Sequence, residues 1–462
     1  MVLPRLAAWL VLPALLLSAC TAPRPPVLRH EQVLDNGLRV IVQEDHRSPV
    51  VVSQLWYRVG GSYEPPGKTG ISHLLEHMMF KGTETLAPGE FSRIIAAEGG
   101  RENAFTGRDY TAYFQTLERS RLEVAFRLEA DRMRRLKLEA AEFEKERKVV
   151  MEERRLRTED RPENLVYERF MQAAFGDHPY GRPIIGWMED LRGLTLADLE
   201  DWYRRWYAPN NATLVVVGDV RPQAVFALAR KHYGALPASP LRPPAPPAAP
   251  APAGPRRITV ARPARVPYLL MGYQVPSAAA PAGPDWEPWA LEVLGNLLAG
   301  GESARLARKL VRGQALAARV AVGYDWAARL TTLFMIDANP APGRSLDELE
   351  AAIAAEIEAL RQAPVPAREL KRVKTQLVAQ DVFERDSVFY QAMKIGQLVT
   401  VGLPPALVER SLERIRAVTA AQVQAVARKY LVPERLTVAR LRPLPISSGT
   451  PPTPAGGKHG SR

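Results

Sequence analysis

A segment repeated in the two halves of the chain sets the strongest limit on its fold. Residues 195–213 and 419–437 match at a constant offset of 224, and each indicates a helix, a proline turn and a β-rich run. Residues 237–255, between the copies, hold nine prolines with alanines among them, which predicts an extended, semi-rigid linker. We therefore expect a duplication of one unit of about 200 residues.

Strand and helix patterns occur in both halves, which predicts an α+β fold in which each repeat is a mixed β-sheet with helices packed on it. Alternating β-branched runs indicate strands at 38–43 and 50–59, and long helical patterns run over 119–135 and 140–157. We expect domains at 30–236 and 256–444, followed by a disordered Pro/Ser/Gly-rich tail at 445–462.

The composition narrows the class of function. The chain has 462 residues, of which 46% are hydrophobic and 24% charged, and these values are typical of a globular protein with substantial cores. The net charge is +12, but the basic residues are spread along helices among acidic ones, so we expect no nucleic-acid partner. The single cysteine, Cys20, excludes a disulfide framework and a thiolate metal site within the chain.

The first residues have the pattern of an export signal. Arg5 is followed by an apolar run that is too short and too close to the terminus for a stable membrane span. The segment 17–20, Leu-Ser-Ala-Cys, resembles the lipobox of bacterial lipoproteins, which implies a signal at 1–20, lipidation of Cys20 and a tether at 21–29. We expect an outer-membrane lipoprotein facing the periplasm, and the alternative is an ordinary secretory signal on a soluble periplasmic protein.

The chemistry of the chain centres on an H-x-x-E-H run. His73 and His77 are four residues apart, which puts both imidazoles on one face of a helix, and Glu76 lies beside them. Two neutral imidazoles are good ligands for a divalent metal, of which zinc is the commonest fit, and a neighbouring carboxylate can take a proton from water. The alternative is an amphipathic helix surface with no metal.

A carboxylate from another helix is the natural third ligand, but spacing alone does not choose among Glu146, Glu152 and Glu153. Residues 102–114 alternate polar and aromatic side chains and indicate two short strands around Gly107. They form either a plain hairpin or a sheet edge that pairs with an extended peptide beside the metal.

Taken together, these residues resemble the pitrilysin-type (inverzincin, M16-like) zinc metallopeptidases, in the short two-domain form related to mitochondrial processing peptidase. The resemblance spans roughly residues 30–440, and four segments carry it: 70–83, 103–113, 146–153 and 178–181. It implies that the two repeats form half of a clamshell chamber, and that the chain is a zinc endopeptidase that hydrolyses peptides or unfolded protein segments.

The resemblance also implies the roles of the site residues. The family's zinc glutamate lies about 76 positions beyond the second histidine, which corresponds to Glu153. One zinc ion per chain would then be held by His73, His77 and Glu153. Glu76 would be the general base, and Glu146 would support catalysis by orienting a ligand.

Substrate contacts are implied in both halves. Asn103, Ala104 and Phe105 would belong to the edge strand that holds the substrate backbone. The family often carries an Arg and a Tyr, seven apart, in its second half, but here those positions are Val311 and Ala318. We therefore expect a partner subunit to supply an Arg/Tyr pair, which predicts a heterodimer. The alternatives are a non-catalytic scaffold subunit and a maturation peptidase for one dedicated substrate.

Overall fold

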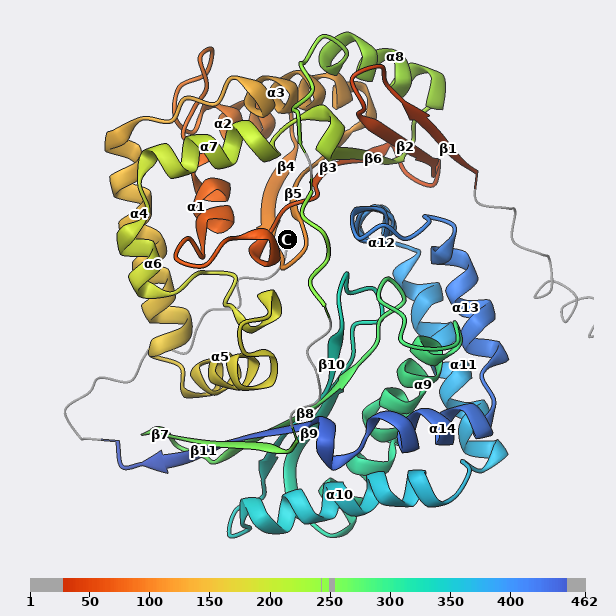
Figure 1. The fold of residues 1–462 in the computed structure, drawn as a ribbon. Helices are drawn as coiled ribbons and strands as arrows, with labels where there is room; N and C mark the ends of the chain where they lie inside the picture. The colour runs from red at the N-terminus through yellow and green to blue at the C-terminus, as the bar shows by residue number, and fades with distance from the viewer. Residues whose placement is uncertain (1–27, 242, 249–253, 447–462) are drawn as a thin grey trace, which may run out of the picture.

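The computed structural model describes residues 28–241, 243–248 and 254–446 (Figure 1). The predicted signal, the lipidation site Cys20, most of the tether and nearly all of the predicted tail lie outside the described residues. Within the described ranges, no helix combines the length and apolar character needed to cross a membrane.

The first half is built on a six-stranded mixed sheet in the order β1-β2-β6-β3-β5-β4. The β2–β6 pair is parallel and all other neighbours are antiparallel. One edge is β4, which pairs only with β5 among the described strands. The strands are β1 Arg29–Val33, β2 Arg39–Glu44, β3 Val50–Tyr57, β4 Arg101–Thr106, β5 Thr111–Glu118 and β6 Ala212–Gly218.

The second half is built on a five-stranded sheet in the order β7-β11-β8-β10-β9. Here β7–β11 is the parallel pair and the remaining neighbours are antiparallel. With β1 set aside, both sheets have the same strand order and directions, which confirms the predicted α+β fold of two repeats. The strands are β7 Arg256–Pro263, β8 Tyr268–Val275, β9 Ala317–Gly323, β10 Thr332–Pro340 and β11 Leu436–Leu444.

Helices pack on both sheets. In the first half they are α1 Ile71–Met78, α2 Glu90–Ala97, α3 Leu122–Arg134, α4 Ala140–Arg154, α5 Pro162–Phe175, α6 Met188–Gly193, α7 Leu196–Trp206 and α8 Pro222–Tyr233. In the second half they are α9 Glu287–Ala299, α10 Leu346–Gln362, α11 Ala367–Glu384, α12 Val388–Thr400, α13 Leu407–Ala417 and α14 Ala420–Tyr430. The helix expected over 140–157 ends in a π-helical turn at Arg155–Glu159, and α5 was not expected.

The repeated segment keeps its structure at the offset of 224. Helices α7 and α14 both begin with a capping box, in which Thr195 and Thr419 satisfy the first backbone amides of the helix. Each helix is followed by a short 3-10 turn that starts at a proline, Pro209 or Pro433, and then by β6 or β11. Local sequence therefore fixes the same helix–turn–strand unit in both halves.

The two halves exchange a helix. Helix α5 packs on β7, β8 and β11 of the second sheet, whereas α12 packs on β3 and β6 of the first (Figure 1). Glycines permit both contacts: a Cβ on Gly272 would lie 2.5 Å from Phe170 of α5, and a Cβ on Gly396 of α12 would lie 2.0 Å from Trp56. Each sheet is therefore covered partly by the other half of the chain.

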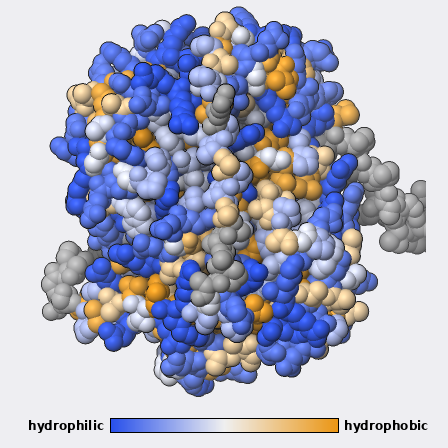
Figure 2. Space-filling view, in the orientation of Figure 1, coloured by the Kyte–Doolittle hydropathy of each residue, from blue (hydrophilic) through white to orange (hydrophobic). Residues whose placement is uncertain are grey.

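Because of this exchange, two of the hydrophobic cores contain residues from both halves. One cluster joins Ile41, Val52 and Trp56 of the first sheet to the apolar helices of the second half, and another joins α5 to the second sheet. A third lies under the helices that cover the opposite face of the first sheet. Hydrophilic residues occupy most of the molecular face in Figure 2, as expected when apolar side chains fill such cores.

Candidate metal centre

Helix α1 carries the H-x-x-E-H run, and its start is held by a buried carboxylate. Gly70, at φ 87°, precedes the helix, and Glu64 accepts hydrogen bonds from the amides of Gly70 at 2.7 Å and Ser72 at 2.9 Å. Glu64 is only 2% exposed, and this burial raises its pKa to about 7, although those hydrogen bonds oppose the shift. The amides that Glu64 binds are among those a helix cannot satisfy by itself, so this carboxylate fixes the beginning of α1.

The third member of the group comes from α4, which packs against α1. Glu153 Oε1 lies 3.9 Å from His73 Nε2, and Glu153 Oε2 lies 3.4 Å from His77 Nε2. One ligand atom from each of the three residues lies within 4.8 Å of the other two. Glu152, the neighbouring candidate, is exposed and pairs with Arg155 instead.

The donor set fits zinc. Ligand atoms bound tetrahedrally at the usual zinc distances lie about 3.3–3.6 Å from one another. The two histidine–glutamate separations, 3.4 and 3.9 Å, are close to that range, and the whole group lies within 4.8 Å, so side-chain adjustments of about 1 Å would bring the three donors to bonding distance. Two imidazoles with one carboxylate also leave a fourth position open, as catalytic zinc sites do.

Burial and neighbouring charges set the protonation of the three residues. Burial, together with the charge of His77, lowers the pKa of His73 to about 4, which favours the neutral imidazole that a metal requires. For Glu153, burial opposes ionisation, but the hydrogen bond with His77 and nearby positive charges leave its pKa below the ordinary value. For His77, burial is outweighed by hydrogen bonds to Glu153 and Glu146, which raise its pKa.

Glu146 lies where it can orient His77. Its Oε2 is 3.2 Å from His77 Nδ1, the ring nitrogen opposite the one that faces Glu153. Its other oxygen pairs with Lys81 Nζ at 2.7 Å, and the carboxylate is buried. A carboxylate on the far nitrogen of a histidine fixes the tautomer and orientation of that ring.

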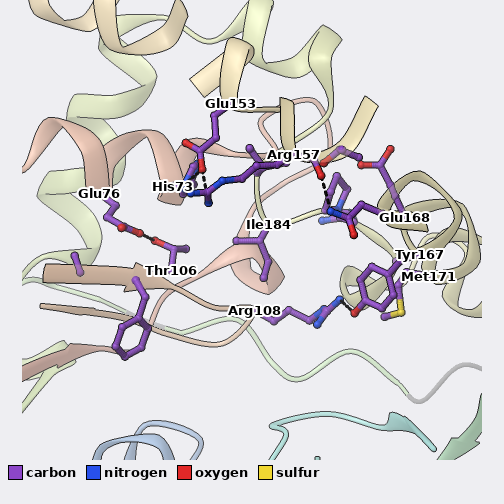
Figure 3. Close-up of a pocket in the computed structure, with 18 residues that line it drawn as sticks. His73, Glu76, Thr106, Arg108, Glu153, Arg157, Tyr167, Glu168, Met171 and Ile184 are labelled. Carbon is purple, nitrogen blue, oxygen red and sulfur yellow. Dashed lines mark hydrogen bonds and ion pairs between the residues drawn. The ribbon is translucent and has the colours of Figure 1, made fainter. Parts of the chain in front are cut away.

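Glu76 faces the same cavity as His73 and Glu153 (Figure 3). Thr106 of β4 donates a hydrogen bond to Glu76 Oε2. Burial raises the pKa of Glu76, and this hydrogen bond opposes the shift in part. A carboxylate with a raised pKa accepts a proton more readily, which suits a general base.

The cavity has a volume of about 460 Å³, and one of its walls is the edge strand β4. Ala104 and Phe105, two of the residues expected to contact substrate, line it. Asn103 is exposed and does not line it, and its side-chain oxygen accepts the amide of Ala104 at 2.9 Å. The three predicted substrate residues thus adjoin the metal group, but only two of them face the cavity.

The second half contacts the β4–β5 turn beside this cavity. Arg329 Nε donates to Asp109 Oδ1 at 3.0 Å, and Arg329 Nη2 donates to Ser62 Oγ at 2.8 Å. The Tyr180 hydroxyl donates to the other oxygen of Asp109. Asp109 and Arg329 are 6% and 11% exposed at their side chains, so this ion pair ties the two halves together out of water.

Val311 and Ala318 are not among the residues that line this cavity. Val311 belongs to the π-helical segment Ala307–Gly313 and packs on the core of the second half. Ala318 lies on β9. Neither residue offers a polar side chain, so among the described residues these two positions supply no group to the metal site.

Sequence reasoning missed four residues that support the site. Arg157 pairs with Glu153 at 2.6 Å, and its position four residues later on the same helix was a usable signal. Lys81 pairs with Glu146 at 2.7 Å, and its position four residues after His77 was a second usable signal. Thr106 and Glu64 had no such signal, because their contacts depend on the packing of β4 and of the segment before α1.

Two family models and several curated proteins match this chain. The family model for insulinase (peptidase family M16) matches residues 39–187, and the model for the peptidase M16 inactive domain matches residues 193–377. The zinc protease PqqE of Helicobacter pylori is 34% identical over 351 residues, which cover 75% of this chain and 78% of that protein. An uncharacterised zinc protease of Mycobacterium tuberculosis is 31% identical over 436 residues, covering 92% and 94%.

Solved structures show the same fold. A protease from Helicobacter pylori superposes with a TM-score of 0.85 at 30% identity, over 90% of this chain and all of that one. The periplasmic protease PqqL of Escherichia coli superposes with a TM-score of 0.75 at 20% identity, over 90% of this chain and 48% of that one, and shows the fold alone. The curated relatives are named zinc proteases, and the chain belongs to the M16 (insulinase/pitrilysin) peptidase family in its two-domain form.

Proposed function

We propose that the chain is a zinc-dependent endopeptidase, with one zinc ion held by His73, His77 and Glu153. The observation that carries the proposal is the convergence of these three side chains beside a cavity that His73, Glu76 and Glu153 line, next to a sheet edge with no partner strand in the described part of the chain. The names of the relatives support the metal and the class of reaction.

Bound zinc would supply Lewis-acid chemistry, lowering the pKa of water to about 7 and polarising the substrate carbonyl. Glu76 would take a proton from the attacking water and pass it to the leaving amine. Thr106 donates to Glu76 Oε2 and would hold this carboxylate in place. Glu146 would keep His77 in the tautomer that presents Nε2.

Strand β4 would hold the substrate. Its outer edge has no partner strand among the described residues, so its backbone groups are available to an extended peptide. Ala104 and Phe105 place that edge at the cavity that holds Glu76. The peptide backbone would pair there, which favours extended or unfolded segments over folded proteins.

The decisive experiment compares the wild-type protein with Glu76→Gln. Wild type should contain about one zinc per chain and cleave peptides from an unbiased library, and a chelator should abolish the cleavage. Glu76→Gln should keep the zinc but lose about 10²–10⁴-fold in rate, since it removes only the base. Undiminished cleavage by Glu76→Gln would exclude the proposed mechanism, and a chain without zinc would favour the scaffold alternative.

We also propose that a partner subunit supplies the Arg/Tyr pair that Val311 and Ala318 replace. The support is the apolar character of both positions in the second half. The isolated chain should then be a weak peptidase, and a co-expressed partner should restore activity. Full activity of a monomer in light scattering and peptide assays would exclude this arrangement.

The lipid anchor at Cys20 is proposed from the sequence of the export signal. Expression of the full chain in a bacterium should place it in the outer-membrane fraction facing the periplasm, with incorporated labelled palmitate. Cys20→Ser should release it to the soluble periplasmic fraction. Membrane association that is unchanged in Cys20→Ser would exclude the anchor.

A further inference from the structure

The cavity that holds the metal group also contains an arginine with no carboxylate partner. Arg108 Nη2 donates to the Tyr167 hydroxyl at 2.9 Å, and Arg108 Nε is shielded from water with no hydrogen-bond partner. Among the described residues, no carboxylate lies within ion-pair distance of this guanidinium. Figure 3 shows Arg108 extending toward Tyr167, away from the Glu76–Thr106 pair.

The other two arginines that line this cavity have carboxylate or carbonyl partners. Arg157 pairs with Glu153 at 2.6 Å. Arg182 donates to the backbone carbonyls of Glu64 at 2.6 Å and Asp177 at 3.3 Å. Arg108 differs from both in that, among the described residues, it has neither a carboxylate nor a carbonyl partner: its partners are the Tyr167 hydroxyl and the Tyr180 ring, whose centre lies 5.7 Å away. A partly buried guanidinium in this state favours an anionic ligand.

Arg108 and Tyr167 also stand where the metal cavity meets a second one. They line both cavities, and the second, of about 410 Å³, is walled on its other side by residues of the second half such as Tyr324 and Asp325. Asp325 is near enough for the Arg108 charge to act on it, but the two make no ion pair in the described part of the chain, and Asp325 Oδ1 accepts the amide of Ala327 at 3.0 Å. A peptide running along β4 past the metal group would therefore meet Arg108 at this junction.

We propose that Arg108 and Tyr167 form a subsite for a carboxylate of the peptide substrate. Arginine presents two parallel N–H groups that match both oxygens of a carboxylate. The Tyr167 hydroxyl accepts its hydrogen bond from Arg108, so its own proton is available to the same ligand. The carboxylate is either that of a Glu or Asp side chain or that of the peptide's C-terminus. The inference rests on the proposed peptidase function and adds a substrate class to it.

The test uses the zinc-loaded full chain and fluorogenic peptides in matched pairs. One series exchanges Glu for Gln at each position around the cleaved bond, and a second exchanges a free C-terminus for an amide. At one position, or at the C-terminus, the charged peptide should be preferred by about 10- to 100-fold in kcat/KM, mainly through KM. The responding series identifies the source of the carboxylate.

Substitutions then assign the preference to Arg108. In Arg108→Gln the ratio between charged and neutral peptides should fall to about one, and Arg108→Lys should keep part of it because the charge remains. Arg204→Gln removes an exposed arginine of α7 that pairs only with Asp201 and should keep the wild-type ratio. Wild-type ratios near one in both series, or an unchanged ratio in Arg108→Gln, would overturn the proposal.

A binding measurement separates this inference from the proposed function. Fluorescence anisotropy with the Glu76→Gln protein reports affinity for the same peptide pairs without hydrolysis. If no peptide is cleaved by wild type but the charged peptide binds about tenfold more tightly, the peptidase proposal fails and the subsite stands. Equal binding of both peptides would overturn the subsite even if cleavage is observed. Should Arg108→Gln fail to fold, the ratio between charged and neutral peptides in wild type and in Arg108→Lys tests the subsite instead.

Discussion

The two halves of the chain have the same sheet topology, but the corresponding helices, α1 and α9, carry different side chains. Both sheets have the same strand order and the same single parallel pair. In the first half, α1 presents His73 and Glu76 to a cavity and places His77 beside Glu153, whereas α9 of the second half has buried apolar side chains along nearly its whole length. Leu297, at the offset of 224 from His73, is fully buried in the core.

This difference shows that the duplicated fold does not itself provide the chemistry. In the described part of the second half, the sheet and the helix packing are retained without a group of side chains that could hold a metal, so the proposed chemistry depends on a few side chains placed on one copy. The second copy nevertheless contacts the site indirectly, since its Arg329 binds Asp109 at the turn that follows β4. One half therefore carries the candidate metal ligands, and the other holds part of their surroundings in place.

The largest expected effect comes from removing a proposed zinc ligand, which only the first half carries. His77→Ala should bind no zinc after dialysis and should lose more than about a thousandfold in peptide cleavage, because a ligand is removed. Metal analysis and a peptide assay measure both. His46→Ala, at an exposed histidine that contacts Asp219, should keep the zinc and the activity. Equal zinc content in the two variants would exclude the assigned ligand set.

A second substitution tests how firmly the halves depend on each other. Arg329→Met leaves Asp109 buried without its ion-pair partner and should lower the free energy of unfolding by about 3–5 kcal/mol. Guanidinium unfolding measures this. Arg319→Met, which removes an exposed pair with Asp337 inside the second half, should change it by less than about 1 kcal/mol. Equal effects would show that the contact between halves is no stronger than a surface pair.

A third prediction concerns pH and the start of α1, for which the second half has no described counterpart. The folded-state pKa of Glu64 is about 7, above the ordinary value, so its protonated form is favoured by folding. Its contribution to stability is complete below about pH 4.5 and is lost as the pH rises through about 7, by up to about 3 kcal/mol. Unfolding measured from pH 4.5 to 8 should therefore show a steeper decline in wild type than in Glu64→Gln.

Glu139→Gln, at an exposed glutamate, serves as the control for Glu64 and should keep the wild-type decline. The comparison uses the slope against pH, because Glu64→Gln also weakens the hydrogen bonds to Gly70 and Ser72 at every pH. Parallel curves for wild type and Glu64→Gln would contradict the assigned protonation.

The smallest expected effect concerns two glutamates of α4, Glu146 and Glu152. Glu146→Gln keeps the size of the side chain but removes the charge beside His77 Nδ1, so zinc affinity should fall about 10- to 100-fold. Competition with a chromophoric chelator measures the affinity. Glu152→Gln changes an exposed glutamate of the same helix and should have no effect. Equal affinities of the two variants would show that Glu146 does not support the ligand.

The parts of this molecule that local sequence determines were predicted well. The repeat at an offset of 224 gave the paired helix–turn–strand units, because capping boxes and proline turns depend on neighbouring residues. The placement of His73 and His77 on one face follows from helix geometry. The choice of Glu153 over Glu152 needed the resemblance to a family, since spacing in a charged helix does not say which side faces α1.

Contacts between distant segments could not be predicted. Helix α5 was missed, and nothing in its sequence says that it covers the sheet of the other half. The Thr106–Glu76 hydrogen bond depends on the packing of β4 against α1, and the Arg108–Tyr167 pair depends on the position of the β4–β5 turn beside α5. Such contacts are decided by tertiary arrangement, to which single-residue patterns are insensitive.

The helix exchange has a consequence for what counts as a folding unit in this chain. Phe170 of α5 and Trp56 of β3 each fill a space that a glycine of the opposite half leaves open, so neither half closes its core alone. A protease cut in the proline-rich linker would break the chain into two fragments, but the shared cores would keep the fragments bound to each other. The linker then acts mainly by raising the local concentration of one fragment around the other during assembly.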